Sequence, residues 1–105
     1  MDTEDITNLV ISSLDEVLRE QRKENEIQID SLDESTYLIG RRAVLDSLGL
    51  VTLIVNIEQR LSDDYGIYVT IADERALSQE KSPFKTVESL SEYVSLLIEE
   101  QKHNG

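Results

Sequence analysis

The stretch Val44-Leu45-Asp46-Ser47-Leu48-Gly49-Leu50-Val51 decides how this chain is organised. Asp46, a residue type that favours helix N-caps, stands directly before an apolar segment that continues to Leu61. Apolar side chains recur in this segment at helical spacing, which predicts a helix that begins near Asp46 or Ser47. A serine at such a place can hold a phosphate group at the positive end of the helix.

The predicted helix carries more apolar residues than one buried face requires. At about 100° per residue, one stripe is sufficient to build a core: Leu50, Leu53, Ile54, Ile57 and Leu61. A second stripe of Leu48, Val51 and Val55 lies beside it and starts next to the serine. Either both stripes are buried in a compact bundle, or the second faces a partner. We expect the second stripe to be exposed, because the polar remainder of the helix is too small to cover it otherwise.

The segments before this helix predict another helix and a long loop. Apolar residues between Ile6 and Leu18 recur at helical spacing, and Asp2 or Thr3 is suited to cap the start. We expect this first helix to end at about Arg22. A loop over Lys23–Gly40 follows, with apolar residues that could hold it against the core: Ile27, Ile29 and Leu32.

The segments after the central helix predict two more helices. Gly66 is a natural helix end, and residues 67–71 alternate between apolar and polar side chains. With no second strand to pair with, we expect these residues to form an extended loop that buries its apolar side. A short helix is expected over Ala72–Leu77, and a polar linker over 78–83. Thr86 is expected to cap a last helix with an apolar side.

Together these elements predict an all-α fold. We expect a small antiparallel bundle of three main helices plus one short helix, with a long loop between the first two. At 105 residues the chain fits one domain, which we place at residues 1–100. Residues 101–105 are predicted to form a polar C-terminal tail that contains the single histidine, His103, in a solvated position.

Composition restricts the classes of partner and compartment. The formal net charge is −12, from 22 acidic and 10 basic residues, so we expect no binding to nucleic acid and favour proteins with basic surfaces. There is no cysteine, which excludes disulfides and thiolate metal sites. The acidic start is unlike a signal peptide, and no run approaches the ~20 apolar residues of a membrane span. We therefore expect a cytoplasmic protein without membrane insertion.

The same sequence argues against catalysis by the chain itself. A Ser-His-acid triad is not expected, because the only histidine lies in the tail. Metal sites built from histidine or cysteine are excluded or nearly so, because the chain has one histidine and no cysteine. No glycine-rich phosphate loop is present. Ser47 remains the one candidate for chemistry, either as a simple helix-start residue or as the carrier of a tethered group.

The motif Leu45-Asp46-Ser47-Leu48, followed by an apolar helix, resembles the Asp-Ser-Leu attachment site of acyl carrier proteins. The order of the other segments is also similar to that family, and the resemblance covers nearly the whole chain. It implies that Ser47 receives 4′-phosphopantetheine from coenzyme A through a phosphopantetheinyl transferase. The thiol of that arm would hold acyl intermediates as thioesters, loaded by a ligase and presented to lipid or fatty-acid biosynthetic enzymes.

The resemblance also implies roles for the neighbours of Ser47. Asp46 matches the acid that helps the transferase recognise the site. The second stripe, Leu48, Val51 and Val55, matches positions that pack against partner enzymes. Glu58 matches an acidic position that meets basic residues on partners. A monomeric, non-catalytic phosphoprotein follows from the resemblance.

Two alternatives stay open at this stage. Gly49 after Leu48 is similar to carriers of special pathways, such as D-alanyl carriers, which makes an aminoacyl cargo the alternative within the same class. Arg41-Arg42, ahead of the motif, is also unusually basic for the family. In another class, the chain is an acidic protein-interaction domain in which Ser47 does no chemistry.

Overall fold

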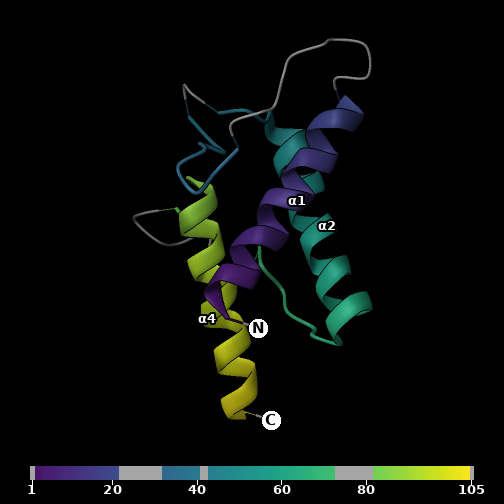
Figure 1. Cartoon of the computed structure of the whole chain (residues 1–105), viewed down its shortest axis with the longest axis vertical. Helices are drawn as coiled ribbons and strands as arrows, with labels where there is room; N and C mark the ends of the chain where they lie inside the picture. The colour runs from purple at the N-terminus through teal and green to yellow at the C-terminus, as the bar shows by residue number, and fades with distance from the viewer. Residues whose placement is uncertain (1, 22–31, 41–42, 73–81, 105) are drawn as a thin grey trace.

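The structure, a computed structural model, describes residues 2–21, 32–40, 43–72 and 82–104. Three helices account for most of these residues: α1 (Thr3–Gln21), α2 (Ser47–Tyr65) and α4 (Val87–Asn104). The described residues contain no β-strand, which confirms the predicted all-α class. In Figure 1, α1 runs in the direction opposite to both α2 and α4.

Several predicted segments lie outside the described residues. They are residues 23–31 of the long loop, Arg41-Arg42, and residues 73–77 of the predicted short helix.

The core lies where α1 packs against the other two helices. α1 contacts both α2 and α4 (Figure 1). Its contribution to the core is a continuous buried face that includes Val10, Leu14 and Leu18. The helix begins as predicted, since the Asp2 carboxylate accepts a hydrogen bond from the Asp5 amide at 2.8 Å. This bond satisfies one of the amides that have no acceptor within the helix.

A polar contact fixes α1 against α2. The Arg60 guanidinium of α2 donates to the Ser12 hydroxyl at 3.1 Å and pairs with the Glu16 carboxylate. Both partners lie on α1, so one side chain of α2 bridges successive turns of the neighbouring helix. These contacts help to fix the register of the two helices.

The described part of the long loop is attached to the start of α4. The carbonyls of Glu34 and Thr36 accept hydrogen bonds from the amides of Glu88 and Val87, at 2.9 and 3.0 Å. These amides belong to the first turn of α4 and have no acceptor within that helix. The loop therefore caps α4, and the buried Leu38 holds the loop to the core.

Thr86 is the N-cap of α4, as predicted. Its hydroxyl accepts from the Ser89 amide at 3.1 Å, and the Ser89 hydroxyl accepts from the Thr86 amide at 3.0 Å. This reciprocal pair is a capping box in which serine takes the place usually held by Glu or Gln.

The segment after α2 also follows the prediction. Gly66 has φ +64°, a left-handed conformation that glycine adopts without strain, and it ends α2. Residues 67–72 then run as an extended loop. Ile71 is fully buried and Ile67 and Val69 pack partly against the core, while Tyr68 faces solvent.

The C-terminal residues differ from the expected tail. Residues 101–104 continue α4, because Gln101 and Lys102 are good helix formers and no glycine precedes Gly105 there. The Gln101 side-chain amide donates to the Tyr68 carbonyl, so this last part of α4 also holds the 67–72 segment. The side chain of His103 lies outside the described residues.

Candidate functional site

The start of α2 is defined by a side-chain cap. Asp46 has extended backbone angles, and its carboxylate accepts a hydrogen bond from the Gly49 amide at 2.7 Å. Its carbonyl accepts from the Leu50 amide at 2.9 Å. The buried Leu45 fixes the preceding residue in the core. The predicted N-cap at Asp46 is confirmed, and it makes residue 47 the first residue of the helix.

Ser47 thus occupies the position at which the helix offers positive charge. Its side chain lies outside what the structure describes, but its backbone begins α2. By helix geometry, the amides of residues 47 and 48 have no acceptor within the helix. Together with the aligned peptide dipoles, they favour a negatively charged group at this end.

The second apolar stripe of α2 is exposed. The exposed fractions are 71% for Leu48, 57% for Val51 and 44% for Val55. On the opposite side of the same helix, Leu53 and Ile57 are fully buried against the core. The structure therefore confirms that α2 has one apolar face inside and another outside. Leu50, predicted to belong to the core stripe, is only partly buried.

Glu58 lies farther along the helix and is held by the neighbouring loop. It is about 16 Å from residue 47 along the helix axis. One of its carboxylate oxygens accepts a hydrogen bond from the Ile71 amide at 2.8 Å, and the residue is partly buried. The sequence prediction placed Glu58 toward partners, but its contact with Ile71 was not foreseen. This carboxylate attaches the 67–72 segment to α2.

Sequence reasoning assigned no role to two tyrosines near the end of α2, one in its last turn and one after it. Tyr68 is 70% exposed and Tyr65 is 51% exposed. Tyr68, Val69 and Thr70 line one side of an open cleft of about 450 Å³, and Val55, Glu58 and Asp63 lie on its α2 side. The alternation of residues 67–71 is the sequence signal that places Tyr68 outward.

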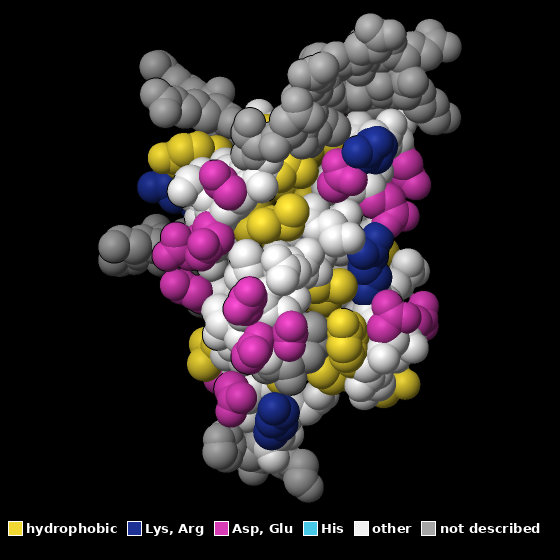
Figure 2. Space-filling model, in the orientation of Figure 1, with side chains coloured by type: hydrophobic (Ala, Val, Ile, Leu, Met, Phe, Trp, Pro, Cys, Tyr) yellow, Lys and Arg dark blue, Asp and Glu magenta, His cyan; other side chains and the backbone are white. Residues whose placement is uncertain are grey.

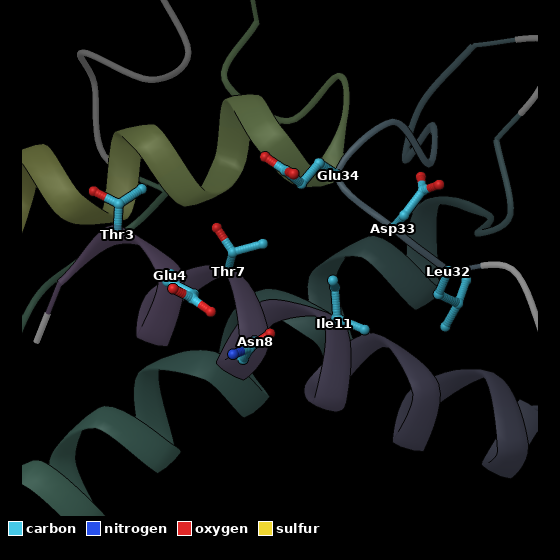
Figure 3. A pocket seen from close by; sticks show the side chains of 8 residues that line it. All are labelled: Thr3, Glu4, Thr7, Asn8, Ile11, Leu32, Asp33 and Glu34. Carbon is cyan, nitrogen blue, oxygen red and sulfur yellow. The ribbon is translucent and has the colours of Figure 1, made fainter.

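A second cleft, of about 490 Å³, lies between α1 and the start of the described loop (Figure 3). In that view Thr7 and Ile11 project from α1, while Leu32, Asp33 and Glu34 belong to the loop. None of the predicted site residues lines this cleft.

Acidic side chains are spread over the face shown in Figure 2, with fewer basic ones among them. Within the described ranges, no group of three or more acidic or histidine side chains is arranged to hold a metal ion. None of the helices described has both the length and the apolar character needed to cross a bilayer.

No known family model matches this chain, and no curated protein and no solved structure matches it.

The cap at Asp46 gives a test of how the helix start is fixed. We expect Asp46→Ala to lower the free energy of unfolding by about 1 kcal/mol, because the Gly49 amide loses its acceptor. Asp46→Asn should change it much less, since asparagine caps as well as aspartate. Urea unfolding followed by circular dichroism measures both. Equal losses in the two variants would contradict the capping role.

Proposed function

We propose that this protein is a carrier protein that bears 4′-phosphopantetheine on Ser47 and presents acyl groups, held as thioesters, to other enzymes. When bound, this group supplies a long arm that ends in a thiol, which the chain itself lacks. The protein contributes the attachment point and the surface that partners recognise, and no catalytic step.

One observation carries the proposal: the capped start of α2 and the exposed stripe lie on the same helix. Leu48 and Val51 are within about one helical turn of Ser47, at exposed fractions above one half. Burial of each of these side chains against a partner would contribute up to about 1.5–3 kcal/mol to binding. An enzyme that acts on a group tethered at Ser47 would be placed to bury them.

The start of α2 also suits the phosphate end of the arm. The amides of residues 47 and 48 point out of the helix end without acceptors inside it. The Asp46 carboxylate next to them would repel a phosphodiester, but its hydrogen bond to the Gly49 amide holds it as a cap and offsets part of that repulsion.

The charge of the chain supports protein partners with basic surfaces. A net charge of −12 accelerates encounter with a positively charged transferase or ligase through long-range attraction. The same charge disfavours self-association, which is consistent with a monomer.

The first test is the mass of the protein after exposure to a transferase. Coexpression with a broad-specificity phosphopantetheinyl transferase should add one phosphopantetheinyl group to the chain, and Ser47→Ala should abolish the addition. The helical circular dichroism of the variant should stay close to that of the original. If the chain stays unmodified under conditions that load a control carrier, it is an acidic interaction domain instead.

The second test separates the exposed stripe from other exposed apolar residues. Leu48→Asp should lower the kcat/KM of the transferase by roughly ten- to a hundredfold, because an interface residue of this kind contributes about 1–3 kcal/mol. Leu96→Asp is the matched control, since Leu96 is 49% exposed but lies on α4. Equal effects of the two substitutions would show that the position on α2 does not matter.

A further inference from the structure

The starts of α2 and α4 are connected by backbone hydrogen bonds, although the two helices are not neighbours. Among the described helices, α1 packs against both α2 and α4, whereas α2 and α4 do not pack against each other. Both begin at the same end of the molecule, where the segment 32–40 lies beside the start of α4 (Figure 1). The contacts of this segment therefore decide whether the two starts are coupled.

Residues 36–38 of this segment pair with the residues that lead into α4. The Val87 amide donates to the Thr36 carbonyl at 3.0 Å, and the Leu38 amide donates to the Lys85 carbonyl at 2.8 Å. The two residues between these bonds form an isolated antiparallel bridge. Because the Leu38 side chain is buried in the core, this pairing has little freedom to shift.

The same residues also hold the chain that leads into α2. The Val44 amide donates to the Tyr37 carbonyl at 3.1 Å. Leu45 is buried, and the next residue, Asp46, is the N-cap of α2. Ser47 thus follows three residues after a hydrogen bond whose acceptor belongs to the pairing with α4.

The start of α4 is itself well fixed. The capping box of Thr86 and Ser89 closes its first turn, and the Ser89 hydroxyl also donates to the Pro83 carbonyl at 2.9 Å. Pro83 and Phe84 are both buried. The first turn of α4 is therefore a firm support for whatever pairs with it.

We propose that the first turn of α4, acting through residues 36–38, is a positioning element for Ser47. It fixes residues 44–46 and so determines where residue 47 is presented to a transferase. A contiguous set of hydrogen bonds and packed side chains can carry such coupling between separate elements. The inference rests on the proposed function for the reaction at Ser47, whereas the coupling between the two helix starts does not depend on it.

The direct test removes one bond of the link from the unmodified protein. Val87→Pro deletes the amide that donates to Thr36, and proline is suited to the first position of a helix. We expect amide exchange at Val44 and Gly49 to accelerate roughly tenfold or more, because both amides would lose protection with the link. Thr3→Pro is the control at the first position of α1, and it should change these rates less than about twofold.

A second pair of variants measures the effect on the reaction. Thr86→Ala should lower the kcat of the transferase roughly three- to tenfold and change its KM for this protein less than about twofold, because the hydroxyl is displaced while the exposed stripe keeps its residues. Thr86→Ser should restore kcat, since serine also caps. Asp2→Ala removes the equivalent cap from α1 and should leave kcat within about twofold of the original.

The two measurements separate this proposal from the carrier function. If the chain is modified but the α4 variants behave like their α1 controls in exchange or in kcat, the positioning proposal fails and the carrier function stands. A rise in KM with unchanged kcat would also overturn it, because it would indicate a change in docking. If the original chain is not modified at all, the carrier function fails, and the exchange rates alone decide whether the two helix starts are coupled.

Discussion

The packing of one face of α2 against the core is the constraint on which the rest of the structure depends. Leu53, Ile57 and Leu61 are completely buried, and each contributes roughly 1.5–3 kcal/mol through removal from water. Since α1 covers this face, and Arg60 fixes the two helices in register through Ser12 and Glu16, α2 cannot rotate to bury its second stripe without exposing the first. The second stripe is therefore exposed because the first apolar face of the same helix is buried.

The two ends of α2 determine where its surface features lie. Asp46 determines where α2 begins, and therefore where residue 47 stands relative to the exposed stripe. Had the helix started one turn earlier or later, the amides of the first turn and the exposed apolar residues would no longer lie together. At the other end, Gly66 ends the helix and turns the chain into the segment that carries Tyr68. Residue 47, the exposed stripe and the cleft are thus placed along one helix by its two caps.

Local sequence patterns predicted the features that depend on residues close together in the chain, namely the helices and their N-caps. Helical spacing located the three helices, and the caps at Asp46 and Thr86 were evident from residue types that bond to amides three positions away. The contacts that escaped prediction join residues far apart in sequence. They are the bond between Glu58 and Ile71, the loop carbonyls that cap α4, and the contact of Gln101 with Tyr68. No periodicity encodes such contacts, because they depend on how the helices pack. Residues 101–104, which the sequence analysis assigns only to a polar tail, continue α4.

The most direct measurement of the central claim is the accessibility of single cysteines, since the chain has none of its own. Ser47→Cys, Val51→Cys and Leu53→Cys are made separately and exposed to a thiol reagent under native conditions, each normalised to its rate in denaturant. The two-faced helix predicts rapid labelling at positions 47 and 51. At position 53, labelling requires unfolding and should be at least about a hundredfold slower. Protection of position 47 or 51 to the same degree as position 53 would contradict the account.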